Sequence, residues 1–445
     1  MVANQDYLID LSPQLSPNMY VEQRGDRVLL LDPEQPTWIV TNKNSANLLG
    51  LFDGNKSVRK ILSLVDNSGS SQYLSAYGVI VKALELGILW VDAPPPRPIR
   101  PKTLNSVHLT LTRKCNLSCI YCYAGSGKPN LPELSAYNWK TIISQIYSAS
   151  GPINFVLTGG EPTLFVDFEQ VAYHIRSLNC TLQLITNGCW RKDVDLKSVV
   201  ELFTQVIVSI DGSSSKINDP HRGDGTFEKA FSTVRLLREH QANVQVAVVV
   251  TKMNANDLNR IRNLFEPMGV FVKFQPVYPL GRGSTRDDIL INGDEYFAFL
   301  RDAEKGKALS LFDSPPQPGT KVVSCGVGGG TLSIDSDGSV YPCHLLHKQE
   351  YAFGRLLDSS FTDILDRVRA SHWYNFNVDS IEECKDCIIR YVCAADCRAR
   401  AVAETGDLYS PDPFCSYFKK ATLDFMFSSG KWTSGINARI GETIS

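Results

Sequence analysis

The sequence predicts an α/β fold whose centre is a partial (β/α)6 barrel, similar to an incomplete TIM barrel. Apolar runs of strand length alternate with amphipathic helical patterns between residues 105 and 280, which is typical of a parallel sheet covered by helices. A proline-rich run at residues 94–101 separates this region from a smaller α+β pattern, and cysteines are concentrated after residue 320. We therefore expect an N-terminal domain (1–93), a linker (94–104), the barrel (105–309), a second linker (310–320), a C-terminal domain (321–427) and a mobile tail (428–445).

The overall composition excludes several classes of protein. Of the 445 residues, 43% are hydrophobic and 21% are charged, and the net charge is −2, so neither a nucleic acid nor a membrane surface is an expected partner. No uncharged apolar stretch reaches the roughly 18 residues of a membrane-spanning helix. Asp6 stands where a signal peptide would carry basic residues. We expect a cytoplasmic protein whose twelve cysteines are metal ligands or reactive thiols rather than disulfides.

The first 93 residues predict a small, winged-helix-like α+β domain. Its short apolar runs have strand length, and the helical patterns that follow have one apolar face. The proline-rich run after Ala93 favours an extended connection over a packed element. The predicted strands are Met19–Val21, Val28–Leu31 and Trp38–Val40, and the helices begin near Asn44, Val58 and Tyr73.

Six strand and helix pairs follow. In one helix the residues Phe227, Ala230, Phe231, Val234 and Leu237 have the spacing of a single buried face. Right-handed crossovers would curl six such units into a partial barrel, whose ligands collect at the carboxyl ends of the strands. The predicted strands are Val107–Leu111, Ile153–Leu157, Leu182–Thr186, Val206–Ile210, Val244–Val250 and Phe271–Gln275.

Beyond the polar stretch Ser310–Gly319 the sequence is rich in Gly and Cys and poor in periodicity. We expect loops to dominate this C-terminal region. Apolar burial alone would hold such a region together poorly, so metal centres are the expected organisers.

Three cysteines follow the first predicted barrel strand, in the run Cys115-x3-Cys119-x2-Cys122. Four cysteines usually hold a protein-bound 4Fe-4S cluster, so three leave one iron open for another ligand. The run resembles the signature of the radical S-adenosylmethionine (SAM) superfamily. The resemblance implies that SAM binds the open iron and is cleaved to a 5'-deoxyadenosyl radical, which makes these three cysteines catalytic. For the triplet alone, a zinc knuckle is the alternative.

Further positions resemble the SAM-binding set of that superfamily. The resemblance implies that Tyr121 lies against the adenine, that Gly159-Gly160-Glu161-Pro162 holds the methionyl amino group, and that the later motifs hold the ribose and the carboxylate. Glycine suits a chain that approaches its ligand closely, and a guanidinium matches a carboxylate. Each of these short motifs, taken alone, could instead be a turn, the start of a helix or a surface ion pair. The later positions are Asn187 in Thr186-Asn187-Gly188, Ser209 and Asp211 in Ser209-Ile-Asp211-Gly212, and Arg222.

Seven cysteines in the C-terminal region resemble the SPASM extension, which carries two auxiliary iron-sulfur clusters in radical SAM enzymes that modify peptides and proteins. The resemblance assigns Cys384, Cys387, Cys393 and Cys415 to an outer 4Fe-4S cluster. It assigns Cys325, Cys343 and Cys397 to an inner cluster, which is one cysteine short. A zinc site is the alternative, although thiol-rich zinc sites are usually closed sets of four.

Three further residues need separate interpretation. His344 follows Cys343. This position resembles the one that carries an Asp base in anaerobic sulfatase maturases, a SPASM family with related chemistry. An imidazole could accept a proton there as a catalytic residue, or make a structural hydrogen bond. Cys180 and Cys189 are interpreted as core or loop residues rather than ligands.

The N-terminal domain resembles the PqqD-like leader-recognition domain of peptide maturases, through Trp38-Ile-Val-Thr-Asn42, Asp53-Gly54 and the pattern around them. In that family a leader peptide adds a strand to the small sheet. A DNA-binding winged helix is the alternative. Residues 1–93 contain seven Lys or Arg and ten Asp or Glu, so this acidic module favours a peptide over DNA.

Together these resemblances predict a radical SAM oxidoreductase with three 4Fe-4S clusters that modifies a ribosomally synthesised precursor peptide. A hydrogen atom would be removed from a core residue to form a carbon-carbon, ether or thioether cross-link. The expected partners are the precursor peptide, with its leader on the N-terminal domain, and a flavodoxin or ferredoxin as electron donor. The alternatives are maturation of a protein such as a sulfatase, peptide excision or epimerisation, and a non-enzymatic iron-sulfur regulator that binds nucleic acid.

Overall fold

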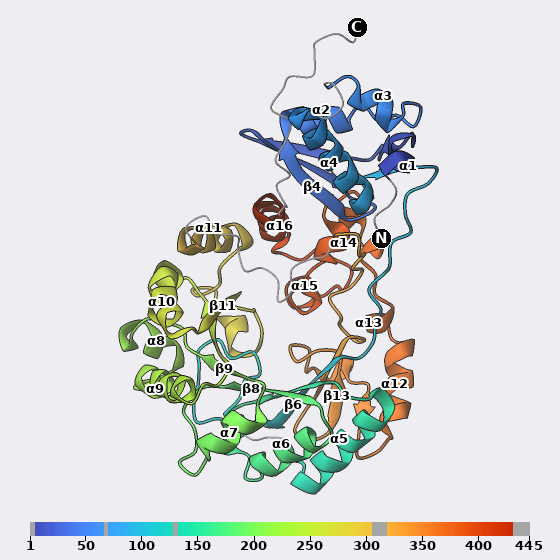
Figure 1. Ribbon diagram of the computed structural model, residues 1–445. Coiled ribbons are helices and arrows are strands. Elements are labelled where there is room, and N and C mark those ends of the chain that lie inside the picture. Colours follow the sequence, from blue (N-terminus) through green and yellow to red (C-terminus); the bar gives the residue numbers. More distant parts are fainter. Residues whose placement is uncertain (1–4, 66–69, 128–131, 305–317, 430–445) are drawn as a thin grey trace.

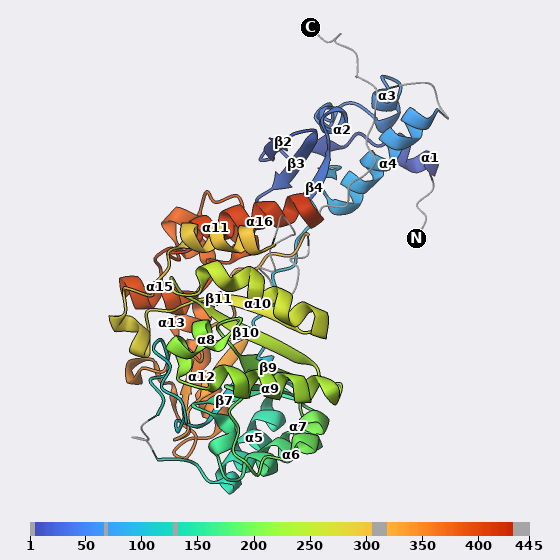
Figure 2. The same ribbon diagram turned by 90° about the vertical axis from the view of Figure 1, so that its left-hand side faces the viewer.

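The computed structural model describes residues 5–65, 70–127, 132–304 and 318–429. The N-terminal unit lies at one end of an elongated molecule and the barrel at the other (Figure 1, Figure 2). In these ranges no helix is both long enough and apolar enough to cross a membrane. Most of the predicted second linker lies outside the described residues. So does the predicted tail, apart from Ser428 and Ser429, which end a helix.

The N-terminal unit is a three-stranded antiparallel sheet, in the order β2-β3-β4, with helices packed on one face. It contains all the predicted strands and helices. A separate strand pair, β1 with β5, ties the start of the unit to its end. The elements are α1 (Gln5–Ile9), β1 (Gln14–Leu15), β2 (Tyr20–Arg24), β3 (Arg27–Asp32), β4 (Thr37–Asn42), α2 (Lys43–Leu49), α3 (Val58–Leu62), α4 (Ser71–Leu86) and β5 (Leu89–Trp90).

The predicted barrel strands are confirmed, and they lie side by side in chain order in a parallel sheet. Continuous β-branched runs form them because both faces of the sheet are buried. Their carboxyl ends therefore meet at one edge, where the predicted site residues begin. The strands are β6 (Ser106–Thr112), β7 (Asn154–Gly159), β8 (Thr181–Thr186), β9 (Gln205–Ser209), β10 (Val244–Val250) and β11 (Phe271–Pro276).

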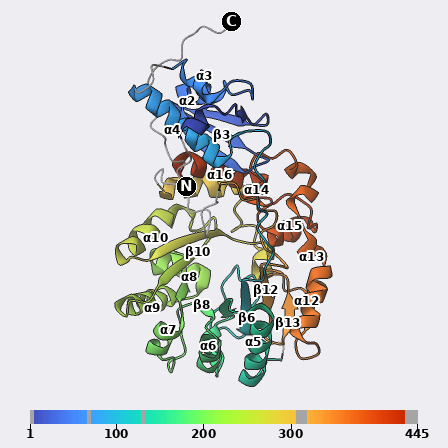
Figure 3. The ribbon, with the colours of Figure 1, turned by 45° about the vertical axis from the view of Figure 1, so that its right-hand side comes forward.

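Helices cover the outside of these strands (Figure 3). The predicted face of α9 is confirmed, since Phe227, Ala230, Val234 and Leu237 are buried in the barrel core. Two short turns also belong to the barrel, η1 (Pro162–Leu164) and η4 (Gly281–Thr285). The helices are α5 (Ala136–Ser150), α6 (Phe168–Ser177), α7 (Leu196–Leu202), α8 (Ser215–Arg222), α9 (Thr226–Glu239), α10 (Leu258–Phe265) and α11 (Gly293–Glu304).

The barrel sheet continues into the C-terminal unit. Strand β12 (Thr331–Ile334) pairs in parallel with β6, from Thr331 opposite Ser106 to Ile334 opposite Leu109. Two antiparallel strands, β13 (Ser339–Tyr341) and β14 (Gly354–Arg355), complete a nine-stranded sheet. The inner part of the cysteine-rich unit is therefore hydrogen-bonded directly to the first barrel strand.

The rest of the C-terminal unit contains more helix than the sequence predicts. Its helices are α12 (Phe361–Ala370), α13 (His372–Asn375), α14 (Arg390–Cys393), α15 (Arg398–Thr405) and α16 (Cys415–Ser429). Helix α16 begins at Cys415 and lies between the N-terminal unit and helix α11 of the barrel (Figure 2). Loops make up about half of this unit, so the expectation of a loop-dominated region is confirmed only in part, and the helices bury apolar faces against the other two units.

Candidate active site and cluster sites

The loop after β6 carries the three cysteines of the triplet, all of them half-buried. The Sγ of Cys115 accepts hydrogen bonds from the backbone N of Leu117 at 3.4 Å and from the Nδ2 of Asn187 at 3.7 Å. Burial raises the pKa of Cys115 to about 11, and Glu161 and the thiols of Cys119 and Cys122 add to the rise. Burial also raises the pKa of Cys119, so neither Cys115 nor Cys119 has enough positive charge nearby to balance it as a thiolate. Iron would supply that charge, so the donor set fits a cluster.

The Gly-Gly-Glu turn after β7 packs on the backbone that leads into this loop. The backbone N of Gly160 donates to the carbonyl of Thr112 at 2.8 Å, and the N of Glu161 donates to that of Lys114 at 2.9 Å. A Cβ on Gly159 or Gly160 would lie closer than 3.0 Å to these carbonyl oxygens. The glycines therefore allow a close approach between two backbone segments, and not only the approach to a ligand that the sequence suggested.

The carboxylate of Glu161 is fully buried. It accepts hydrogen bonds from Thr163 Oγ1 at 2.8 Å, Thr186 Oγ1 at 2.9 Å and the backbone N of Asn187 at 2.8 Å. Burial raises the pKa of Glu161, and these hydrogen bonds oppose the rise. Glu161 therefore ties the end of β7 to the end of β8. Its predicted contact with SAM stays a prediction.

Asn187 and Ser209 lie at the ends of the next strands. The Nδ2 of Asn187 donates to Asn116 Oδ1 at 2.8 Å as well as to Cys115, so the third strand end is joined to the cysteine loop. Ser209 is half-buried and is the last residue of β9. Their predicted roles at the ribose and carboxylate of SAM remain predictions.

Tyr121, Asp211 and Arg222 form one buried group. The hydroxyl of Tyr121 and the Nε of Arg222, the latter at 2.5 Å, both donate to Asp211 Oδ2, while Asp211 Oδ1 accepts from the backbone N of Val249 at 2.8 Å. The guanidinium of Arg222 also lies 5.7 Å from the centre of the Tyr121 ring. Arg222 is thus already paired with a carboxylate of the protein, and Tyr121 is anchored through its hydroxyl.

Sequence reasoning did not predict that Arg282, in the turn after the last barrel strand, forms hydrogen bonds with the cysteine loop. The Nε of Arg282, in η4, donates to the carbonyl of Cys119 at 2.8 Å, and its Nη1 donates to that of Ser126 at 2.7 Å. A Cβ on Gly281 would collide with the carbonyl oxygens of Cys122 and Tyr123. The available signal was Gly281-Arg-Gly283 in the segment that follows β11, where the barrel closes on its first loop.

A cavity of about 230 Å³ lies between the barrel mouth and the C-terminal unit. Gly159 and Tyr123 line it from the barrel side and His344 from the other side. The His344 ring stacks on His108 of β6, with centroids 4.5 Å apart, and meets the edge of Tyr123 at 5.8 Å. Its Nδ1 is 3.6 Å from Cys343 Sγ. The cavity therefore joins the first cysteine loop to the second cysteine set.

A polar network forms the other wall of this cavity. His347 contacts Ser333 Oγ through Nε2 at 2.8 Å and Asp335 Oδ2 through Nδ1 at 3.4 Å. Arg113, from the cysteine loop, donates through Nε to both oxygens of Asp335, at 2.9 and 3.0 Å. Ser333 is fully buried and cannot meet a substrate, so this Ser-His-Asp arrangement holds His347 in place and is not a nucleophilic triad.

Electrostatic interactions connect the C-terminal thiols in two sets. Burial raises the pKa of Cys384 to about 11, with further contributions from Cys387 and Cys415, and Cys393 responds to the same two thiols. Burial likewise raises the pKa of Cys397 to about 12, with Cys325 among the contributors, and Cys325 in turn interacts with Cys343. Thiols gathered in this way fit iron-sulfur clusters, whose binding would offset their electrostatic cost. The predicted assignment of ligands to each cluster stays a prediction.

The turn between Cys393 and Cys397 explains how neighbouring cysteines can serve different groups. Its three residues, Ala394, Ala395 and Asp396, all have left-handed φ angles between 48° and 62°, which is rare outside glycine. Arg400 holds the turn through ion pairs with Asp396 at 2.5 Å and with Asp412 at 2.8 Å. The turn therefore reverses the backbone between the two cysteines.

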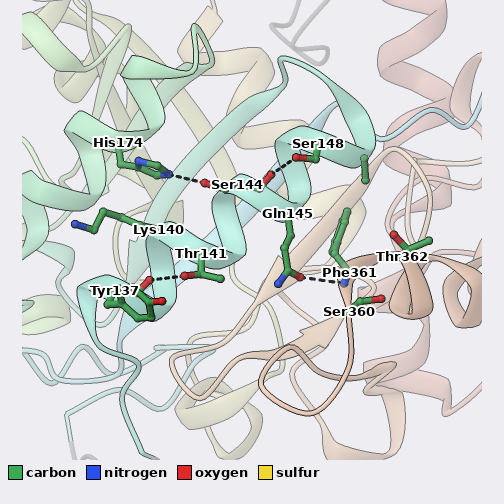
Figure 4. Close-up of a pocket in the computed structure, with 11 residues that line it drawn as sticks. Tyr137, Lys140, Thr141, Ser144, Gln145, Ser148, His174, Ser360, Phe361 and Thr362 are labelled. Carbon is green, nitrogen blue, oxygen red and sulfur yellow. Dashed lines mark hydrogen bonds between the residues drawn. The ribbon is translucent and has the colours of Figure 1, made fainter.

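Cys180 and one further hollow lie apart from this chemistry, whereas Cys189 adjoins the cysteine loop, because its carbonyl accepts a hydrogen bond from Asn116 Nδ2 at 2.6 Å. Cys180 and Cys189 are buried, and Cys180 is part of the barrel core as predicted. A hollow of about 770 Å³ lies between α5, α6 and α12 (Figure 4). Its polar side chains bond to their own neighbours, as Ser144 Oγ does with His174 Nε2 at 2.9 Å. It contains none of the predicted site residues.

The chain matches two families in the regions described above. Residues 109–265 match the radical SAM superfamily, and residues 325–388 match an iron-sulfur cluster-binding domain, SPASM. The chain therefore contains a radical SAM domain followed by a SPASM domain. It is a SAM-dependent enzyme that carries a SAM-binding 4Fe-4S cluster and auxiliary clusters.

Several known proteins are similar to it. The AdoMet-dependent heme synthase of Methanosarcina barkeri is 26% identical over 339 residues, covering 69% of this chain and 95% of that protein. The mycofactocin maturase MftC of Mycolicibacterium smegmatis is 27% identical over 319 residues, covering 68% and 81%.

Two solved structures share the fold. AdoMet-bound anSMEcpe has a TM-score of 0.58 at 20% identity, over 74% of this chain and 97% of that one. Streptococcus suis SuiB bound to its precursor peptide SuiA has a TM-score of 0.53 at 14% identity, over 91% and 99%. They support the partial barrel followed by a C-terminal iron-sulfur domain.

Proposed function

We propose that this enzyme modifies a ribosomally synthesised precursor peptide, forming a side-chain cross-link in its core. The observation that carries the proposal is the extent of the likeness to SuiB. Residues 94–445 make up about four fifths of the chain, so a match over 91% of it must include part of the N-terminal unit. The heme synthase and anSMEcpe cover 69% and 74%. The extra unit therefore favours a substrate that needs a second contact, which a leader peptide provides.

In this proposal Cys115, Cys119 and Cys122 hold the first cluster, and the strand ends around them hold SAM. A cluster with bound SAM supplies a 5'-deoxyadenosyl radical, which removes one hydrogen atom from the substrate. The protein keeps water away from this chemistry by burying Tyr121 of the loop together with Asp211. Gly281 and Arg282 hold the loop against the last strand, so the cysteines keep their geometry.

The substrate residue would enter the cavity between Gly159 and His344. His344 lies there beside Tyr123, and it remains the proposed proton acceptor. The inner cysteines, Cys325, Cys343 and Cys397, adjoin this cavity through Cys343, so an auxiliary cluster there is suited to take the electron left by bond formation. The outer set, Cys384, Cys387, Cys393 and Cys415, would relay it to a flavodoxin or ferredoxin. The proposed compartment is the cytoplasm.

The N-terminal unit is proposed to be a PqqD-like leader-recognition domain. Strand β2 is an edge of its sheet, and Val21 there is 57% exposed. A sheet with an exposed edge can accept an added peptide strand. Leader binding would raise the local concentration of the core at the barrel mouth.

The test is direct. The reduced, reconstituted enzyme should convert SAM to 5'-deoxyadenosine and should lower the mass of a precursor peptide encoded beside its gene by two hydrogens. The Cys119→Ala variant should do neither. The same core peptide without its leader should be modified much more slowly. Equal rates with and without the leader would favour the sulfatase-maturase alternative, and SAM cleavage with no peptide product would contradict the proposed substrate.

A further inference from the structure

The N-terminal sheet is buried on both faces, although the helices of its own unit cover only one. Val28, Leu30 and Ile39 pack with α2, α3 and α4 in one cluster. The alternate residues Leu29, Leu31, Trp38 and Val40 are at most 5% exposed and belong to a second cluster. A sheet with one solvent-exposed face has strands that alternate apolar and polar residues. Because β3 is apolar throughout, a second part of the protein must cover the other face of this sheet.

That second partner is the part of the C-terminal unit that holds the outer cysteines. Ile389, Leu423, Met426 and Phe427 complete the second cluster, and Cys387 and Cys393 pack against it. Helix α16 begins at Cys415 and presents Leu423, Met426 and Phe427 to the sheet further along its length. Three of the four proposed outer ligands thus lie on elements that contact the N-terminal unit. Figure 1 shows α14 and α16 directly below this unit.

Ion pairs surround the apolar contact. Arg390, between Cys387 and Cys393, pairs with Glu34 of the N-terminal unit at 2.7 Å. Arg24 of β2 pairs with Asp424 of α16 at 2.5 Å and lies 4.2 Å from the centre of the Phe427 ring. An apolar centre within a charged rim is typical of a stable domain interface. The contact therefore fixes how the N-terminal unit sits on the outer cysteines.

We propose that the N-terminal unit covers one side of the outer auxiliary centre, which Cys384, Cys387, Cys393 and Cys415 would hold: its docking shields the Cys387 and Cys393 side from water and oxygen, while Cys415 is exposed. This inference rests on the proposed assignment of those four cysteines to one cluster. It gives the N-terminal unit a second role beside leader binding. Loss of docking should expose the outer cluster further and leave the inner one unchanged, because β12 joins the inner set to the barrel independently of this interface.

The experiment uses the full chain with Cys115, Cys119 and Cys122 changed to Ala, so that bound iron reports only the auxiliary centres. Leu423→Asp places a carboxylate in the apolar contact, and Glu34→Lys turns the rim ion pair into a repulsion. Glu85→Lys makes the same charge change at an exposed position of α4, where Glu85 pairs with Lys82, and serves as the control. Hydrogen exchange of residues 27–42 reports docking, and iron and sulfide retained over time in air report the clusters.

We expect Leu423→Asp to raise exchange in residues 27–42 and to speed the loss of about half of the iron by at least tenfold, because a buried carboxylate strongly favours the open state. Glu34→Lys should do the same to a smaller extent, and it keeps the test decisive if Leu423→Asp does not fold. Glu85→Lys should match the parent.

Three outcomes would overturn the inference. Exchange could rise with no change in iron loss, iron loss could speed up with exchange unchanged, or neither could change in either variant. Failure of the proposed function would look different. The parent protein itself would then hold iron for fewer than two auxiliary clusters before any interface residue is changed.

Discussion

Arg222 donates a hydrogen bond through Nε to the carboxylate of Asp211 at 2.5 Å, with 7% and 0% of the two side chains exposed. This pair joins the end of β9 to α8, directly beneath the cysteine loop. A buried ion pair of this kind is poorly tolerant of losing one partner, because the other charge is then left without compensation.

Asp211→Asn should therefore lower the free energy of unfolding by about 3–5 kcal/mol, measured by urea denaturation of the metal-free protein. The matched control removes both charges, in Asp211→Asn with Arg222→Met. This double variant should lose less stability than Asp211→Asn alone. A double variant that is less stable than the single one would show that the pair is not the source of the loss.

Gly160→Ala should prevent the first cluster from forming. Its Cβ would meet the carbonyl oxygen of Lys114 and push the cysteine loop away from β7. Reconstituted protein should bind about four fewer iron atoms while the auxiliary clusters stay intact by electron paramagnetic resonance. Gly78→Ala in α4, where a Cβ meets nothing within 4 Å, is the control and should bind the full amount. An unchanged iron content in Gly160→Ala would contradict the close approach described here.

Thr331→Cys should complete the inner centre. Ser333 pairs with Tyr341, so two residues earlier Thr331 lies near the level of Cys343, and among the described residues its buried hydroxyl has no hydrogen-bond partner. A thiolate there would be the fourth sulfur ligand of a cluster held by three. Mössbauer spectra of the variant should show four thiolate-ligated irons where the parent shows one distinct site. Thr422→Cys, another buried threonine without a partner for its hydroxyl, should leave the spectrum unchanged.

Acid should weaken the protein through Asp335. Burial alone would raise the pKa of this carboxyl, but His347 and Arg113 outweigh it and hold the pKa far below its usual range. A depressed pKa contributes stability that is present above the unfolded value, about 3.9, and is lost as the pH falls below it. The metal-free parent should thus exceed Asp335→Asn in urea midpoint at pH 7, and the gap should shrink below about pH 4. A gap that stays constant down to pH 3 would contradict this.

Much of the fold could be predicted because its patterns are local. The strand Val244–Val250 is an unbroken β-branched run, and the face from Phe227 to Leu237 repeats at helical spacing, so both were predicted with little error. The three cysteines and the Gly-Gly-Glu turn could also be identified, because each is a short contiguous motif. Their meeting at one sheet edge follows from the parallel order of the strands.

The parts that could not be predicted depend on partners far apart in the chain. Nothing around Thr331 indicates that it pairs with Ser106. The hold of Arg282 on the cysteine loop is equally non-local, as is the contact of Leu31 with α16. From the sequence, Arg222 is predicted to pair with the carboxylate of SAM. Its buried partner in the protein, Asp211, could not be identified because spacing alone does not show which residues meet.

The parallel pairing of β12 with β6 leaves no hinge between the chamber of the first cysteine loop and the inner thiols. Separating them would require breaking a ladder of backbone hydrogen bonds at the centre of a nine-stranded sheet, at a free energy comparable to unfolding the core. A peptide substrate must therefore enter a cavity of fixed shape, because it cannot push the two units apart. Clusters held by these two sets of cysteines would accordingly keep the same separation with and without a bound substrate.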